Sequence, residues 1–112
     1  MKATLPLPPS VNAMYRHFGH TVYKTQEAKA WIREASFLLK AAPFKDKVAV
    51  NIDYYFKRDS DIDNRIKALL DLLQSKGIIT NDNQVYRLVV TKNFDKKNPR
   101  VELSISDFIP EQ

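Results

Sequence analysis

The sequence predicts a small α+β domain in which a mixed sheet of about four strands carries two helices on one face. Apolar residues alternate with a period of two in some segments and recur every three or four residues in others. The resulting order is strand, helix, strand, helix, strand, strand. The 112 residues are enough for one hydrophobic core. We therefore expect residues 1–112 to form a single domain, although the pattern does not set the order of the strands.

The first half of the chain predicts a strand, a loop and a helix. Residues 2–7 form a short strand that ends at Pro8 and Pro9, because proline cannot donate a hydrogen bond to a sheet. Residues 10–24 are predicted as a loop. Residues 25–42 have helical spacing of apolar side chains, begin with a threonine suited to N-capping and are followed by a proline that would end the helix.

The second half predicts another strand, another helix and two final strands. Residues 47–57 alternate and predict a half-buried strand, and residues 64–75 return to the helical period. Gly77 stands where a helix commonly takes its C-terminal cap. Residues 85–91 and 100–106 are alternating and β-branched, and a polar, turn-rich connection joins them. They predict an antiparallel hairpin.

The aromatic side chains fall into two groups. Trp31, Tyr54 and Phe56 lie on the apolar faces of the predicted elements, so we expect them in the core. Tyr15 and Phe18 fall in the predicted loop, where spacing does not show whether they are exposed.

The charge of the chain is unevenly distributed. The formal net charge is +5, yet residues 59–82 carry five acidic and three basic residues, so the remainder carries +7. A basic chain favours a polyanionic partner, with nucleic acid first. The absence of cysteine excludes disulfides, a thiolate nucleophile and cysteine-type zinc sites. The proline-rich start resembles neither a signal peptide nor a membrane span, so we expect a soluble, cytoplasmic protein without a membrane partner.

Two carboxylates at the predicted strand-to-helix junction stand out within the acidic segment. Asp61 and Asp63 would project to one side if the strand extended that far, and Lys67 and Asp71 follow Asp63 at helical spacing. Asp59 adds a further carboxylate whose repulsion a divalent cation would relieve. Oxygen ligands of this kind suit Mg²⁺, which binds one or two protein carboxylates, several waters and phosphate oxygens. The pattern therefore favours metal-assisted phosphate chemistry.

The acidic segment admits two other interpretations. Asp63 could cap the helix while Lys67 forms ordinary surface pairs, and spacing alone leaves this alternative open. An EF-hand calcium loop starting at Asp59 fails, because Asn64 occupies the position that needs glycine and Leu70 the position that needs glutamate.

Three separated segments form an ordered set of motifs. They are Leu5-Pro6-Leu7-Pro8-Pro9-Ser10-Val11-Asn12 with Tyr15-Arg16-His17, then Asp61-Ile62-Asp63-Asn64 with Lys67, and finally Asn81-Asp82-Asn83-Gln84-Val85. The set resembles the signature of the RusA-type Holliday-junction resolvases, endonucleases of phage and prophage origin, and implies a RusA-like fold. The resemblance also implies that Asp61, Asp63 and Asp82 bind the catalytic Mg²⁺, for which Mn²⁺ could substitute. Lys67 would be the essential basic residue.

The same resemblance implies a substrate and an assembly. The expected activity is Mg²⁺-dependent hydrolysis of opposed strands in four-way DNA by a homodimer, in DNA recombination and repair. Two alternatives remain: a nuclease for flaps, forks or other branched DNA, and a basic DNA-binding module without catalysis.

Seven basic residues are the expected DNA contacts. The resemblance suggests Arg16 and His17 near the site. Lys57 and Arg58 could replace the basic residue that family members can carry where this chain has Ser60. Lys92, Lys96 and Lys97 could contact a phosphate backbone, although a solvated turn explains them equally well.

Overall fold

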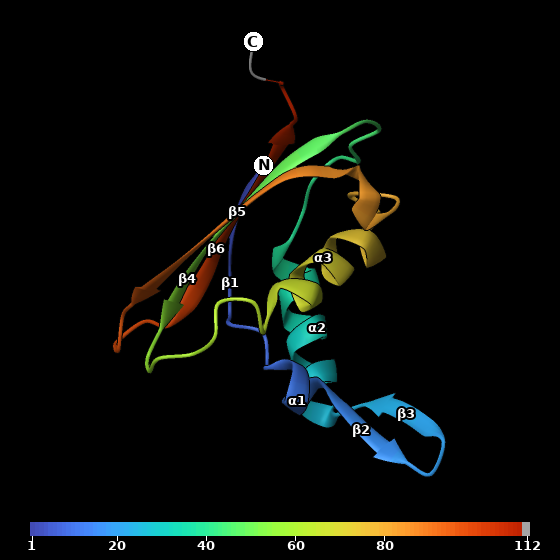
Figure 1. Ribbon diagram of the computed structural model, residues 1–112, viewed down its shortest axis with the longest axis vertical. Coiled ribbons are helices and arrows are strands. Elements are labelled where there is room, and N and C mark those ends of the chain that lie inside the picture. Colours follow the sequence, from blue (N-terminus) through green and yellow to red (C-terminus); the bar gives the residue numbers. More distant parts are fainter. Residues whose placement is uncertain (111–112) are drawn as a thin grey trace.

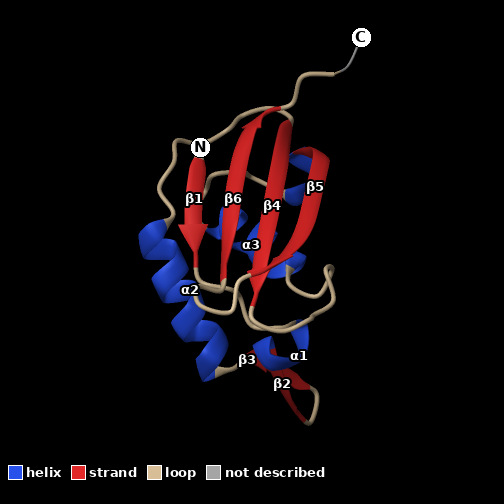
Figure 2. Cartoon of the chain, turned by 90° about the vertical axis from the view of Figure 1, so that its left-hand side faces the viewer, coloured by secondary structure: helices blue, strands red, loops and turns tan. Residues whose placement is uncertain are grey.

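A four-stranded sheet with two helices on one face forms the body of the molecule (Figures 1 and 2). The computed structural model describes residues 1–110. The strands lie in the order β1-β6-β4-β5. Their bounds are β1 Lys2–Leu5, β4 Val48–Phe56, β5 Val85–Phe94 and β6 Arg100–Asp107, and the two helices are α2 Gln26–Leu38 and α3 Ile66–Ser75. This mixed α+β architecture confirms the predicted fold class.

The core lies between the sheet and the two helices. Alternate residues of β4, from Val48 to Phe56, are buried against the helices, and Leu69 and Leu73 of α3 are fully buried opposite them. Trp31 is buried on α2 and donates its indole N–H to the carbonyl of Pro6 at 2.8 Å. The core assignments of Trp31, Tyr54 and Phe56 are therefore confirmed.

The predicted hairpin of the last two strands is wrong. β5 pairs in parallel with β4, while β6 pairs antiparallel with the opposite side of β4. The β4-α3-β5 segment is a strand-helix-strand unit, whose crossover places its two strands parallel. The chain then crosses the end of β4, where the Asp95 amide donates to the Phe56 carbonyl at 2.9 Å. The local turn signals between residues 92 and 99 are compatible with either path, so they could not reveal this one.

The predicted loop at residues 10–24 contains regular structure. A short helix, α1 (Val11–Met14), leads into a two-stranded hairpin of β2 (Tyr15–Phe18) and β3 (Thr21–Lys24), which projects from the body (Figures 1 and 2). Gly19 adopts a positive φ of 61° in the two-residue turn, a conformation that favours glycine. Each face of this hairpin mixes polar and apolar side chains, which is why hydrophobic periodicity missed it.

The helix boundaries agree with the predictions at three of four ends within two residues. The Thr25 hydroxyl accepts from the Ala28 amide at 3.1 Å and caps α2, and Gly77 with φ 72° follows the C-cap of α3. However, α2 ends at Leu38, because the buried Leu39 adopts extended backbone and turns the chain back toward the sheet. At 13 residues α2 is the longest helix, and none within residues 1–110 is long and apolar enough to cross a bilayer.

Candidate functional site

Asp61 and Asp63 lie in an exposed turn between β4 and α3. β4 ends at Phe56, so the strand does not extend to these residues and the expected strand alternation does not orient them. The turn is closed instead by the Asn64 amide, which donates to the Asp61 carbonyl at 3.4 Å. Within residues 1–110, neither carboxylate forms a hydrogen bond or an ion pair. Both are therefore available to a ligand.

Arg65 fastens this turn to the body of the protein. Its Nε donates to the Pro8 carbonyl at 2.8 Å, and its Nη1 donates to the Ser60 hydroxyl. The guanidinium also lies over the Phe56 ring, 5.2 Å from its centroid. A single arginine thus joins two of the motif-bearing segments, through two residues that lie 57 positions apart. Nothing in its spacing had marked it as important.

Lys92 holds the other side of the turn. Its ammonium lies 2.7 Å from the Asp59 carboxylate and donates to the Ser60 carbonyl at 3.2 Å. The hydrogen bond and charge of Lys92 lower the pKa of Asp59. The ammonium therefore offsets the expected repulsion between Asp59 and Asp61, and DNA would have to compete with Asp59 for Lys92.

The helix-capping interpretation of Asp63 is wrong. The N-cap of α3 is Arg65 without a side-chain cap hydrogen bond, and its first turn contains no acidic residue. Lys67, also in the first turn, forms an exposed i,i+4 pair with Asp71 at 3.4 Å. An exposed pair of this kind is worth only a few tenths of a kcal/mol. It can break readily to release the ammonium.

The third motif forms a turn whose polar residues cap one another. A 3₁₀ turn, η1 (Asp82–Gln84), is preceded by Asn81, whose side chain accepts from the Asn83 amide at 3.0 Å. Gln84 accepts from the Thr80 amide at 2.6 Å and donates to the carbonyls of Phe44 and Asp46. Asp82 is exposed, and its carboxylate has no partner in the described part of the chain.

A single chain does not bring the three carboxylates together. Asp61 and Asp63 precede α3 and Asp82 follows it, so the ten-residue helix alone separates them by about 15 Å. No group of three acidic or histidine side chains within residues 1–110 could hold a metal ion. Within one protomer, Asp82 therefore does not lie beside the Asp61–Asp63 turn.

Two of the carboxylates nevertheless fit a divalent cation. Asp61 and Asp63 offer oxygen ligands with no competing partner in residues 1–110, and Mg²⁺ takes one or two such carboxylates while keeping several waters. The third ligand would have to come from elsewhere.

The other basic candidates lie on segments that lead into the Asp61–Asp63 turn, are joined to it, or lie at the same end of the sheet. Lys57 and Arg58 lead into it from β4, and the exposed Lys96 and Lys97 lie in the β5–β6 connection at the same end of the sheet. Arg16 and His17 are exposed on β2, which continues from α1, and the Val11 amide of α1 donates to the Asn64 carbonyl at 3.2 Å. The fold therefore places several basic segments at the end of the sheet where these carboxylates lie.

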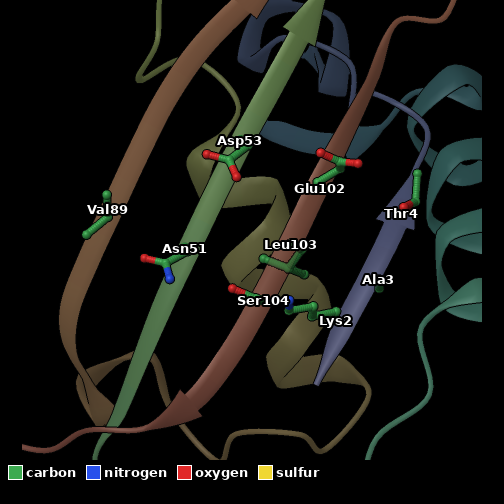
Figure 3. Close-up of a pocket in the computed structure, with 9 residues that line it drawn as sticks. All are labelled: Lys2, Ala3, Thr4, Asn51, Asp53, Val89, Glu102, Leu103 and Ser104. Carbon is green, nitrogen blue, oxygen red and sulfur yellow. The ribbon is translucent and has the colours of Figure 1, made fainter.

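A separate hollow lies away from the Asp61–Asp63 turn. Figure 3 shows it on the face of the sheet that the helices leave open, with Asp53 and Glu102 on neighbouring strands. Both carboxylates already have partners: Asp53 accepts from the Thr91 hydroxyl, and Glu102 lies 3.6 Å from the Arg100 guanidinium. This arrangement is a polar sheet surface and not a second acidic site.

Exposed carboxylates amid basic side chains are typical of a protein that acts on a polyanion. Residues 6–106 match the family Endodeoxyribonuclease RusA. The chain therefore belongs to the RusA family and is an endodeoxyribonuclease, and a divalent metal requirement goes with this nuclease family.

Relatives that match nearly the whole chain support the same family membership. Crossover junction endodeoxyribonuclease RusA of Aquifex aeolicus (strain VF5) is 29% identical over 110 residues, covering 93% of this chain and 86% of the relative. The protein of the same name from Escherichia coli (strain K12) is 31% identical over 110 residues, and that of Enterobacteria phage 82 is 31% identical over 112 residues. Each of these two alignments covers 93% of this chain and 92% of the relative.

Proposed function

We propose that this protein is a Mg²⁺-dependent Holliday-junction resolvase that hydrolyses opposed phosphodiester bonds in four-way DNA during recombination and repair. Residues 1–112 would act as one endonuclease domain in a cytoplasmic homodimer, with Asp61, Asp63 and Asp82 as metal ligands. The relatives named as crossover junction endodeoxyribonucleases support the substrate. Mn²⁺ is expected to substitute for Mg²⁺, because it also accepts carboxylate ligands.

The observation that carries this proposal is the contrast between the three aspartates and their neighbours. Arg65, Asn81 and Gln84 each form hydrogen bonds that hold the turns in place. The carboxylates of Asp61, Asp63 and Asp82 form none among residues 1–110 and remain exposed. Carboxylates that contribute nothing to the fold yet stand within fixed turns suit ligand binding better than a structural role.

A homodimer would solve the separation of the third carboxylate. Among residues 1–110, β5 is an edge strand whose one neighbouring strand is β4, and it exposes large apolar side chains, including Tyr86 at 57% and Phe94 at 60%. Exposed apolar edge strands readily pair with another chain. A second copy that pairs antiparallel with β5 about a two-fold axis would set the start of one β5 against the end of the other.

That arrangement would place the third metal ligand, Asp82, at the end of the sheet where the Asp61–Asp63 turn lies. Asp82 lies three residues before β5, whereas Lys92, near the end of β5, contacts the segment at Asp59 and Ser60. Antiparallel pairing would therefore carry Asp82 of the partner subunit toward the Asp61–Asp63 turn, and the symmetry would form two sites. Two sites are what paired incisions in a four-way junction require.

Each group of candidate residues would have its own role in the reaction. Asp61 and Asp63, with Asp82 of the partner subunit, would hold the ion, whose bound form polarises the scissile phosphate and acidifies a water. Lys67 would leave Asp71 and bring its ammonium to the negative charge that develops on the phosphate. Lys57, Arg58, Lys96 and Lys97 would hold the flanking backbone without reading sequence.

A nicking assay tests the proposed function. A synthetic four-way junction should be cut at opposed strands with Mg²⁺ or Mn²⁺ but not with EDTA, and Asp61→Asn should bind the junction without cutting it. Fork, flap and linear duplex DNA serve as comparison substrates. Preferred cutting of a fork or flap would refute the junction assignment, and undiminished cutting by Asp61→Asn would refute the metal site.

Mixing two inactive variants tests the shared site. A dimer of one Asp61→Asn chain and one Asp82→Asn chain keeps one intact site only if Asp82 acts across the interface. The mixture should therefore recover nicking of one strand, while each variant alone stays inactive. If the mixture remains as inactive as its components, the two chains do not share their ligands in this way.

A substitution on β5 tests the interface itself. Val89→Lys should shift sedimentation from dimer toward monomer and lower nicking in parallel, because it places a charge on the exposed edge strand. Leu38→Lys, an equally exposed position on α2, is the matched control and should remain dimeric. A dimeric, fully active Val89→Lys protein would place the interface elsewhere.

A further inference from the structure

The projecting β2–β3 hairpin presents two aromatic rings and a cation on one face. Arg16 and Phe18 lie two residues apart on β2, and Tyr23 of β3 is paired with Arg16 in the register. Side chains that are two apart or directly opposite share a face of a β-ribbon. Phe18 is 78% exposed and Tyr23 is 49% exposed. The ribbon thus offers aromatic surface to solvent.

The base of the hairpin is fixed beside the Asp61–Asp63 turn. The Thr25 amide donates to the Met14 carbonyl at 3.0 Å and the Thr25 hydroxyl donates to the Ala13 carbonyl at 2.6 Å, which closes the base. The Val11 amide joins the same base to Asn64 at 3.2 Å. Phe18 stands three strand residues beyond Tyr15, about 10 Å from the base. The rings are therefore held at a set reach from the two carboxylates.

The charge around these rings suits a nucleic acid. Residues 1–26 contain no aspartate or glutamate, whereas the hairpin contains Arg16, Lys24 and two histidines. An isolated two-stranded hairpin is only marginally stable in water. Because Phe18 is 78% exposed, its ring buries little apolar surface that could stabilise this one. Aromatic rings among cations are the usual means of stacking on an unpaired or unstacked base while the cations contact phosphates.

We infer that Phe18 stacks on a base exposed at the branch point of the DNA, with Tyr23 as a second aromatic surface and Arg16 at the adjoining phosphate. In a continuous duplex every base is covered by its neighbours, so the ring has no face to contact. At a branch point the stacking is interrupted and a base face is accessible. Phe18 would thus distinguish branched from linear DNA by structure, an inference that rests on the proposed function.

Fluorescence of 2-aminopurine at the branch point of a four-way junction tests this contact. Measurements are made in EDTA, so that binding is observed without cutting. The parent protein should change the fluorescence on binding, and Phe18→Ala should abolish that change and lower the affinity for the junction about 10-fold. Its affinity for linear duplex should change less than about twofold, and Phe18→Trp should retain the parent's behaviour.

Phe37→Ala is the matched control. Phe37 is 74% exposed on α2, outside the hairpin, so its loss removes similar apolar surface and should leave the fluorescence change and the junction preference intact. A Phe18→Ala protein that behaves like the parent would overturn the inference, and so would equal losses in both alanine variants. A parent protein that cuts the junction without any fluorescence change would overturn this inference alone, whereas one that neither binds nor cuts branched DNA would overturn the proposed function.

Discussion

The two acidic turns at opposite ends of α3 are held in different ways. The Asp61–Asp63 turn is fixed by residues distant in sequence, through Arg65 to Pro8 and through Lys92 to Asp59. The Asn81–Gln84 turn is capped mainly by its own side chains, and Gln84 adds two bonds to the 44–46 segment. Both turns leave their aspartates exposed. In each turn, therefore, one set of residues fixes the backbone, and a different set, the exposed aspartates, remains available to bind a ligand.

Removing an aspartate should have the largest effect and should be equal at both turns. Asp82→Asn is expected to reduce the nicking rate by more than the roughly 100-fold loss that outer-shell residues produce, while leaving the unfolding free energy nearly unchanged. Single-turnover cleavage and chemical denaturation measure the two quantities. Asp107→Asn, at another exposed aspartate, is the control and should cut normally. A modest loss at Asp82 beside a complete loss at Asp61 would remove Asp82 from the ligand set.

Breaking the long-range clamp should have the next largest effect. Arg65→Ala removes two hydrogen bonds and a ring contact, so it should lower the unfolding free energy by about 1–3 kcal/mol and the nicking rate by about 10- to 100-fold. DNA affinity should change much less, because the turn is displaced while the basic surface remains. Denaturation, single-turnover cleavage and binding titrations separate these effects. A loss of affinity equal to the loss of rate would make Arg65 a DNA contact and not a positioning residue.

Breaking the local cap should have a smaller effect. Gln84→Ala leaves the Thr80 amide and two carbonyls without their side-chain partner, yet these groups lie near solvent and water can replace it. We expect a loss of about 1 kcal/mol in unfolding free energy and less than about 10-fold in nicking rate. Gln84→Glu keeps the acceptor for the Thr80 amide, so its stability and nicking rate should fall between those of the parent and those of Gln84→Ala. If Gln84→Ala nicked more slowly than Arg65→Ala, the Asn81–Gln84 turn would matter more for activity than the clamp on the Asp61–Asp63 turn, contrary to this prediction.

The smallest effect concerns pH. Lys92 lowers the pKa of Asp59 below its ordinary value of 3.8, so the contribution of this pair to stability is present above that value and is lost as the pH falls through the lower, folded value. In Lys92→Met the carboxyl should titrate nearer its ordinary value. NMR titration of the Asp59 side chain in the parent and in Lys92→Met measures this. An unchanged Asp59 titration would mean that the ion pair does not persist in solution.

Regular elements with a clear period could be predicted from the sequence. β4, α2 and α3 follow from one-sided apolar spacing, and Thr25 and Gly77 mark helix ends by their capping chemistry. The β5–β6 error arose because turn signals are local, whereas the choice of neighbour depends on the α3 crossover. The β2–β3 hairpin was missed although Gly19 marks its turn, because its side chains form no buried face.

The candidate site could be predicted only where its residues form a local spacing pattern or belong to a family motif. Spacing selected Asp61 and Asp63, since two carboxylates beside a helix start are visible in sequence. Asp82 came from the resemblance alone, because its distance in sequence carries no geometric information. Arg65 was missed, since its partners are the Pro8 carbonyl and the Ser60 hydroxyl, groups that no charge or periodicity pattern reveals.

The length of α3 has a consequence for when the protein can cut. If one chain supplies two ligands before the helix and the third after it, an isolated protomer is inert, and cleavage competence begins only when two copies meet. Specific activity should then rise with protein concentration and level off once all chains are paired. Because the ten-residue α3 separates the ligands within one chain, the nuclease would stay inactive at low protein concentration without any inhibitor or modification.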